Sequence, residues 1–385
     1  MTTVNTKVLF ISHDAQPHGA QILLLHLVRW LIKNTGIVPQ VLLKRSGPLA
    51  KDFEAVAHTF VLKEGDFEGL LRQCRRERYD LIYSNTITNG EVLQALATYD
   101  CPVITHVHEL GYWISYRSGA VNNAQVVQNT DYFIACSQAV ADCLHQMLSV
   151  PRNQIFLVHE FISTRTEGFD VAVARQKTRT ELGLSPNCWV VGGSGTTDWR
   201  KSPDLFVQLA NEVKPRPGGP EIHFLWVGGD HAGPEFGMLW HDVQRLGLEK
   251  RVHFLGHREN PREIFAAFDV FALTSREDPY PLVNLEVAAL GIPVVGFEKS
   301  GGVREWVEED AGFVVPYLDV REMGRRVSEL FDQPELRARL GARARQKVRE
   351  RHDVAMAGAR FANIIEWTNL NRRMACAGLK PQEAA

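Results

Sequence analysis

Hydrophobic positions along this chain fall in short runs that alternate with longer amphipathic stretches. Such alternation is typical of parallel strands that are covered by helices on both faces of a sheet. A Gly-containing loop and a helix over Ile22–Ile32 follow the first run. The expected strands of the first series are Val8–Ser12, Val38–Leu43, Leu81–Ser84, Val103–Thr105 and Tyr132–Ala135.

The pattern weakens into polar and charged residues over 160–179 and then resumes. The strands expected in the second series are Trp189–Gly192, Phe224–Val227, Val252–Leu255, Val270–Leu273 and Pro293–Gly296. We therefore predict two doubly wound α/β domains, over residues 1–165 and 166–364. An amphipathic helix is expected over Val354–Arg373, and the C-terminal part at about 365–385 is expected to return to the first domain. Hinges are expected near residues 165 and 365, and ligands in a cleft between the domains, where loops follow the strands.

Length and charge agree with this division. A chain of 385 residues exceeds the usual size of one hydrophobic core. A net charge of −2 argues against a nucleic-acid partner. The Arg-dense stretch 337–351 is interpreted as a solvated helix face, with contact to an anionic membrane as the alternative.

Cysteine usage and hydrophobic run length indicate the compartment. The six cysteines show no paired spacing, which argues against a zinc site or a disulfide framework. No apolar run is long enough for a signal peptide or a membrane span. We expect a cytoplasmic protein, with a peripheral contact at the membrane as a further possibility.

The segment from Ser275 to Glu286 carries the strongest chemical signal. A buried strand ends at Thr274, an acidic loop follows, and a helix begins near Leu282. The N-terminal amides of such a helix point into the loop and offer a seat for phosphate oxygens. Ser300, Gly301 and Gly302 follow the next strand, where small residues let a ligand approach the backbone.

This segment resembles the E-x7-E segment of retaining glycosyltransferases of family 4, which adopt the GT-B fold of two Rossmann-like domains. In that family the first acid contacts hydroxyls of the donor sugar and the second binds the ribose. The resemblance gives these places to Asp278 and Glu286, and leaves Glu277 one residue out of register. Pro279 and Pro281 replace the family's usual glycines, and proline has no amide hydrogen. Backbone contacts to the donor are therefore expected from the amides of Tyr280, Leu282 and Val283.

A second Gly-rich loop follows the strand that opens the second series. Gly192, Gly193 and Gly195 allow tight turns, and Arg200 and Lys201 stand near the start of the next helix, a combination suited to a diphosphate. A solvated helix start is the alternative. The resemblance matches Lys201 to the family's lysine, whereas the family's arginine is absent and Arg200 is its expected substitute.

The first domain contributes two further segments. His108 and Glu109 follow a strand, where a histidine beside an acid can bind a substrate hydroxyl. The resemblance aligns the pair with the family's His-Asp or His-Glu pair and makes His108 a contact to the donor sugar; a structural histidine is the alternative. After the first strand the family's Gly-Gly pair becomes Gly19-Ala20, so only Gly19 is carried over.

The resemblance implies transfer of a hexose from a UDP- or GDP-linked sugar to an acceptor hydroxyl, with retention at the anomeric carbon, in glycan or polysaccharide synthesis. The acceptor is expected to be a glycan, a lipid-linked molecule or a small molecule. The candidate catalytic residues are His108, Lys201 and Asp278. The candidate donor-binding residues are Gly19, Gly193, Arg200, Lys201, Asp278, Tyr280, Leu282, Val283 and Glu286.

No cofactor or metal is expected, because the sequence has no Asp-x-Asp pair and cations with helix dipoles can stabilise the leaving diphosphate. No residue is placed as a covalent nucleophile, so we expect a front-face reaction in which the leaving phosphate helps to take the acceptor proton. The alternatives are a nucleotide-sugar epimerase or hydrolase of the same fold, and a non-catalytic sugar-nucleotide-binding subunit. An NAD-dependent dehydrogenase is disfavoured because no strand is followed by G-x-G-x-x-G.

Overall fold

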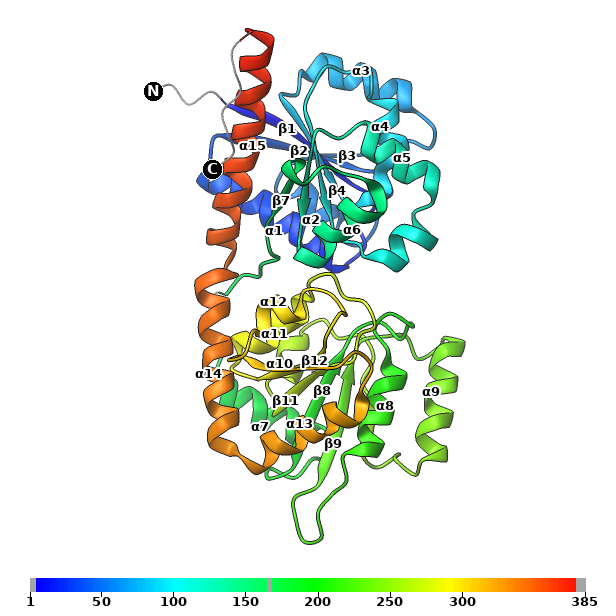
Figure 1. Cartoon of the computed structure of the whole chain (residues 1–385), viewed down its shortest axis with the longest axis vertical. Helices are drawn as coiled ribbons and strands as arrows, with labels where there is room; N and C mark the ends of the chain where they lie inside the picture. The colour runs from blue at the N-terminus through cyan, green and yellow to red at the C-terminus, as the bar shows by residue number, and fades with distance from the viewer. Residues whose placement is uncertain (1–4, 165–167, 379–385) are drawn as a thin grey trace. The chain divides into compact units, whose positions relative to one another are not determined.

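A computed structural model describes residues 5–164 and 168–378 of the chain (Figure 1). It divides into two compact units: the residues up to Ser163 with those from His352 onward, and the residues Thr164–Arg351. The chain thus returns to the first unit at His352, earlier than the expected position near 365. The reason is that one helix, α15 (Val354–Cys376), belongs to the first unit along its whole length.

Unit 1 contains a seven-stranded parallel sheet of order β3-β2-β1-β4-β5-β6-β7. Its strands are β1 (Thr6–Ser12), β2 (Ile37–Leu43), β3 (His58–Val61), β4 (Leu81–Asn85), β5 (Val103–Val107), β6 (Tyr132–Ala135) and β7 (Ile155–Leu157). Its helices are α1 (Gly19–Asn34), α2 (Ala50–Glu54), α3 (Phe67–Glu77), α4 (Gly90–Ala95), α5 (Ala120–Gln128), α6 (Gln138–Leu148) and α15, with short helical turns at Ile87–Asn89, Trp113–Arg117 and Arg152–Gln154. The order reverses between β1 and β4, which places the topological switch point there.

Unit 2 contains a six-stranded parallel sheet of order β10-β9-β8-β11-β12-β13. Its strands are β8 (Trp189–Ser194), β9 (Ile222–Val227), β10 (Val252–Phe254), β11 (Val270–Leu273), β12 (Val294–Phe297) and β13 (Gly312–Val315). Its helices are α7 (Val171–Glu181), α8 (Pro203–Glu212), α9 (Pro234–Arg245), α10 (Pro261–Phe265), α11 (Leu282–Ala289), α12 (Val303–Val307), α13 (Val320–Asp332) and α14 (Pro334–Arg351). The corresponding switch point lies between β8 and β11. The prediction of two doubly wound sheets is confirmed.

The strands that the hydrophobic pattern did not reveal are β3, β7 and β13, and each lies at the edge of its sheet. Edge strands are short and bury fewer side chains, so they lack a long apolar run. In β3, His58 and Val61 are exposed, and all three residues of β7 are only half-buried.

Helix α15 lies alongside α1 in unit 1 (Figure 1). Gly358 makes the close approach possible, because a Cβ atom there would lie 2.4 Å from the Trp30 ring. One turn further, the Phe361 ring centroid is 5.2 Å from that of His106. The helix therefore covers part of the sheet that carries β5.

Helix α14 corrects the interpretation of the Arg-dense stretch as a solvated face. Lys347 is fully buried and donates to the carbonyl oxygen of Val307 at 3.2 Å, while it also pairs with Glu308 at 2.8 Å. Arg345 donates to the carbonyl oxygen of Leu290 at 2.6 Å. These cations fix α14 to the rest of unit 2, as does Arg337, which lies over the Trp189 ring at 4.2 Å. Arg339 and Arg349 are exposed, as a solvated face requires.

Among the helices that the structure describes, none combines the length and apolar character that a membrane span requires.

Candidate functional site

In unit 2 the loops that follow β8 and β11 meet at the switch point of the sheet. The Nζ atom of Lys201 lies 2.5 Å from Oδ2 of Asp278, and both side chains are largely buried. The Ser275 hydroxyl donates to the same carboxylate oxygen at 3.2 Å. Two of the predicted catalytic residues, separated by a long stretch of sequence, are thus in direct contact.

The surroundings of the Lys201 ammonium change its pKa. Burial lowers the pKa of Lys201, the Asp278 carboxylate opposes that shift, and Arg200 lowers it further, so that it stays below its ordinary value. The Lys201 ammonium donates to the Asp278 carboxylate, and the Arg200 guanidinium donates to the carbonyl oxygen of Glu277 at 3.4 Å. They form the cationic side of this site.

Arg276 holds the two loops together, and its role was not predicted from the sequence. Its guanidinium makes two hydrogen bonds to the Asp204 carboxylate, at 2.9 and 2.7 Å, and donates to the Ser202 hydroxyl at 3.0 Å. Its backbone amide donates to the carbonyl oxygen of Arg200 at 2.8 Å. Such a two-point pair fixes geometry as well as charge, so Arg276 sets the position of the loop that presents Lys201.

The glycines of the β8 loop divide into two kinds. Gly193 lies inside the strand, and a Cβ atom there would come within 2.7 Å of the Trp226 ring and 2.8 Å of Phe206. Core packing therefore requires a small residue at position 193. This packing role differs from the donor contact expected for Gly193. Gly195 follows the strand with φ of +150°, and a Cβ atom there would lie 2.8 Å from Cγ of Lys201. Gly195 is the glycine that lies against a site residue.

The loop between β11 and α11 is fixed by the segment that follows β12. The amide of Asp278 donates to the carbonyl oxygen of Ser300 at 2.6 Å, and the amide of Gly302 donates to that of Pro279 at 3.0 Å. Tyr280 is buried, and a Cβ atom on Gly302 would lie 2.4 Å from its ring. Gly302 thus makes room for Tyr280, and the close ligand approach suggested by the sequence stays a prediction.

Helix α11 begins as predicted at Leu282, after Pro281. The amides of Leu282 and Val283 belong to its first turn, where no intrahelical acceptor exists, and are oriented for an anion. Glu286 lies one turn along the helix and is half-buried. Burial raises the pKa of Glu286, and the Arg262 guanidinium partly opposes that shift.

In unit 1, His108 follows β5 and is bound at both ring nitrogens. Nδ1 lies 2.7 Å from Oε1 of Glu160, and Nε2 lies 3.0 Å from Oδ1 of Asn85. Both ring contacts thus come from residues distant in sequence, and neither comes from the neighbouring Glu109. The Glu109 carboxylate instead accepts the amides of Ile87 and His108, at 3.1 and 2.9 Å. Glu160 is a partner that sequence reasoning missed.

His106 shares the face of β5 with His108, since their ring centroids are 3.9 Å apart. Its Nδ1 atom is 2.8 Å from the Tyr83 hydroxyl, and burial holds its pKa well below the ordinary value. One ligand atom from each of His106, His108 and Glu160 lies within 4.8 Å of the others, a spacing compatible with a metal ion. Because the hydrogen-bonded pair of His108 and Glu160 already matches donor to acceptor, we assign no metal to this group.

The loop after β1 completes the carboxyl edge of unit 1. Gly19 is exposed and forms the first residue of α1. His13 and Asp14 both contact Gln21, whose side-chain nitrogen lies 3.1 Å from the His13 ring and 2.5 Å from the Asp14 carboxylate. Thr86, after β4, has φ of +86°, a strained backbone region of the kind found at functional sites.

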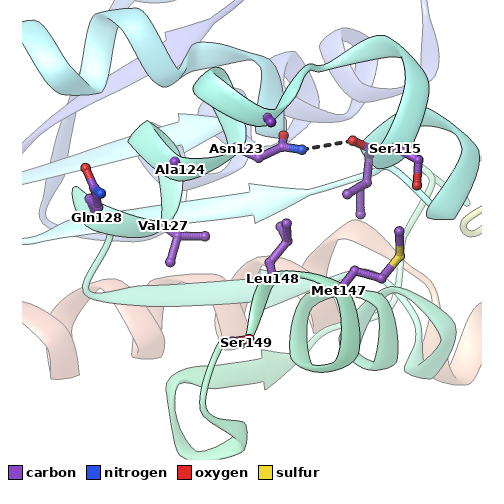
Figure 2. Close-up of a pocket in the computed structure, with 10 residues that line it drawn as sticks. Ser115, Asn123, Ala124, Val127, Gln128, Met147, Leu148 and Ser149 are labelled. Carbon is purple, nitrogen blue, oxygen red and sulfur yellow. Dashed lines mark hydrogen bonds between the residues drawn. The ribbon is translucent and has the colours of Figure 1, made fainter.

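A separate cavity of about 610 Å³ lies in unit 1 among α5, the end of α6 and the turn Trp113–Arg117 (Figure 2). Asn123 projects toward that turn and donates to the carbonyl oxygen of Ile114 at 2.8 Å. The residues that line the cavity are Ile114, Ser115, Ala120, Asn123, Ala124, Val127, Gln128, Met147, Leu148 and Ser149. None of the predicted site residues is among them.

Two curated relatives share part of the sequence. The chain is 28% identical to N-acetyl-alpha-D-glucosaminyl L-malate synthase of Bacillus anthracis, over 64% of this chain and 63% of that protein. It is 27% identical to D-inositol 3-phosphate glycosyltransferase of Corynebacterium glutamicum, over 73% of this chain and 71% of that protein.

Solved structures share the fold. The Anabaena protein HepE in complex with UDP and glucose superposes with a TM-score of 0.81 at 22% identity, over 94% of this chain and 99% of that one. Sucrose-phosphate synthase of Thermosynechococcus elongatus gives a TM-score of 0.76 at 20% identity, over 97% of this chain and 100% of that one.

Two family descriptions match successive parts of the sequence. Glycosyltransferase Family 4 matches residues 17–166, and Glycosyl transferases group 1 matches residues 174–347. Together they take up most of the chain and correspond to the first and second doubly wound sheets. The chain therefore belongs to the group 1 glycosyl transferases of glycosyltransferase family 4.

Proposed function

We propose that this protein transfers a hexosyl group from a nucleoside diphosphate sugar to an acceptor hydroxyl, with retention of anomeric configuration. The observation that carries the proposal is the contact of Lys201 with Asp278 at the switch point of unit 2. Ligands of open α/β sheets bind at this place. A buried cation beside a carboxylate offers one group for phosphate and one for sugar hydroxyls.

In this proposal Lys201, Arg200 and the first-turn amides of α11 stabilise the departing diphosphate. Fixed charges and dipoles aimed at developing negative charge cost no reorganisation during the reaction. Asp278 and Glu286 accept hydrogen bonds from hydroxyl groups of the donor, and His108 binds the donor sugar. The leaving phosphate then helps to take the proton of the acceptor hydroxyl.

For the donor we propose a UDP-linked sugar, with a GDP-linked sugar as the alternative. Support comes from the solved Anabaena HepE complexes, whose bound molecules are UDP, glucose and UDP-glucose. For the acceptor we propose a small polar molecule, because the relatives described above are named for L-malate and for inositol 3-phosphate. A glycan or lipid-linked acceptor is the alternative. It is supported by a further relative, from Streptococcus pneumoniae, which is named alpha-galactosylglucosyldiacylglycerol synthase.

We further propose that the protein acts in the cytoplasm, in a biosynthetic route to a glycan or glycoside, with a peripheral contact at the membrane. The sequence spacing of the six cysteines, with no C-x-x-C pair, agrees with a reducing compartment.

The first experiment measures melting temperature with a panel of nucleotide sugars. A ligand that binds only the native state raises the melting temperature, so the true donor stands out. Turnover is then measured with and without candidate acceptors, on the wild type and on the Lys201→Ala and His108→Ala variants. A transferase loses turnover by about 100-fold or more while its circular dichroism spectrum is kept.

The alternatives give different results in the same assay. Release of free sugar or of an isomer without any acceptor would identify a hydrolase or an epimerase. A melting shift with UDP but no turnover with any donor and acceptor pair would identify a binding subunit and contradict the proposal. The matched control is Lys250→Ala, since Lys250 is exposed and follows α9.

A further inference from the structure

His108 is surrounded by hydrogen-bond acceptors at both ring nitrogens. The Asn85 amide is oriented by its nitrogen, which donates to the carbonyl oxygen of Ala20 at 3.1 Å, so its oxygen faces Nε2 of His108 at 3.0 Å. At the other nitrogen, the Glu160 carboxylate lies 2.7 Å away. An amide oxygen and an ionised carboxylate both accept hydrogen bonds, so this geometry suits a ring with a proton on each nitrogen, an imidazolium.

The charge of this ring is balanced inside the protein. The His108 side chain is 9% exposed and that of Glu160 is 6% exposed, so water contributes little to either. Burial by itself lowers the pKa of His108, but the charge and hydrogen bond of Glu160, with the charge of Glu109, outweigh it and raise the pKa. Titratable groups that face the pair also include His106, the Tyr83 hydroxyl that it contacts, and His352.

Glu160 is itself fixed by the backbone of unit 1. Its carbonyl oxygen accepts a hydrogen bond from Nδ1 of His352 at 3.0 Å. Two residues on, the Ile162 amide donates to the carbonyl oxygen of His352 at 2.9 Å, and the Val354 amide donates to that of Ile162 at 3.0 Å. The segment that carries Glu160 is thus held by the segment that leads into α15, independently of any ligand.

We infer that Glu160 is a positioning residue, which holds the His108 ring in one orientation and keeps it cationic for contact with the donor. The inference rests on the proposed function for the role of His108. A donor oxygen would take the place of Asn85 at Nε2, whereas Glu160 stays at Nδ1. The positive charge at Nε2 then depends on a carboxylate on the far side of the ring.

The test substitutes Glu160→Gln, which keeps the shape and removes the charge, and Glu160→Asp, which keeps the charge. Histidine titration by NMR is followed in protein with labelled imidazole nitrogens. In the wild type the His108 ring is expected to stay protonated above pH 6.5, and in Glu160→Gln it is expected to lose its proton at lower pH. Glu160→Asp should restore much of the wild-type titration.

Turnover provides the second measurement. The cationic ring is the active form, so activity falls as pH rises through the His108 pKa of the folded protein, and removal of Glu160 moves this alkaline limb to lower pH. At pH 8 the kcat of Glu160→Gln is expected to fall by about 10-fold to 100-fold, as for loss of a buried charged hydrogen bond, with a smaller loss at pH 6. Glu91→Gln, an exposed carboxylate in unit 1, is the control and keeps the wild-type profile.

Two outcomes overturn the inference. An unchanged His108 titration in Glu160→Gln would mean that Glu160 does not set the charge of the ring. A loss of melting temperature with an unshifted pH profile would reduce Glu160 to a structural role. Failure of the proposed function is recognised separately, because the wild type would then transfer no sugar to any acceptor, whatever the NMR titration gives.

Discussion

At the scale of single residues, the sequence could predict those site residues whose signal is contained in one short segment. Asp278 and Lys201 were identified because each stands in a short motif after a strand, and the parallel sheet brings those strand ends together. Glu160 carries no such signal, since it lies 52 positions from His108 in a stretch without a clear pattern. The sequence likewise cannot distinguish Gly193, which packs against two aromatic rings, from Gly195, which lies against Lys201.

Arg276 gives a prediction at this scale. Arg276→Lys keeps the charge but loses the two-point pair with Asp204, so the loop carrying Lys201 becomes less ordered. We expect the KM for the donor to rise about fivefold, corresponding to about 1 kcal/mol, with little change in melting temperature. Steady-state kinetics with varied donor concentration measure the effect. Arg325→Lys, at an exposed ion pair on α13, is the matched control, and an equal rise there would contradict the interpretation.

At the scale of elements, hydrophobic runs predicted the central strands and the edge strand β10, but left out the edge strands β3, β7 and β13. The central strands are buried on both faces and leave a continuous apolar signature, whereas β3 is exposed at both of its ends. Helix α15 was predicted as a helix, but its packing was not. Its start at Val354 was predicted, but its place in unit 1 along the whole length depends on contacts with α1, far away in the sequence.

The contact between α1 and α15 gives the second prediction. In Gly358→Ala the new methyl group meets the Trp30 ring, and the cost of overpacking, about 1–3 kcal/mol, exceeds the gain of about 1 kcal/mol from replacing a helical glycine. We expect a lower free energy of unfolding for unit 1 and faster amide exchange in α1 and α15. Urea unfolding and hydrogen exchange measure the two effects.

The control for this substitution is Gly237→Ala in α9. A Cβ atom on Gly237 has open space around it, so the substitution is expected to stabilise its helix by up to about 1 kcal/mol. A gain of stability in Gly358→Ala as well would mean that Trp30 moves aside freely, and would contradict the packing argument.

At the scale of the whole molecule, the reaction depends on how negative charge on the leaving diphosphate is balanced. In the proposed function, Arg200, Lys201 and the amides of α11 supply positive charge from the protein itself. We therefore expect full turnover in excess EDTA, with the donor at saturating concentration. Loss of turnover that Mn²⁺ restores would contradict this prediction and point to a metal that bridges the phosphates.

The division of the chain into units has a consequence for synthesis in the cell. Unit 1 is discontinuous, since all of unit 2 lies between β7 and α15 in the sequence. Phe361, Ala357 and Ile365 of α15 are buried, so the surface they cover stays open to solvent until the ribosome has produced the intervening residues. Unit 2, being continuous, can complete its core first. A nascent chain that stalls before α15 would present an unfinished apolar surface, the kind of exposure that chaperones recognise.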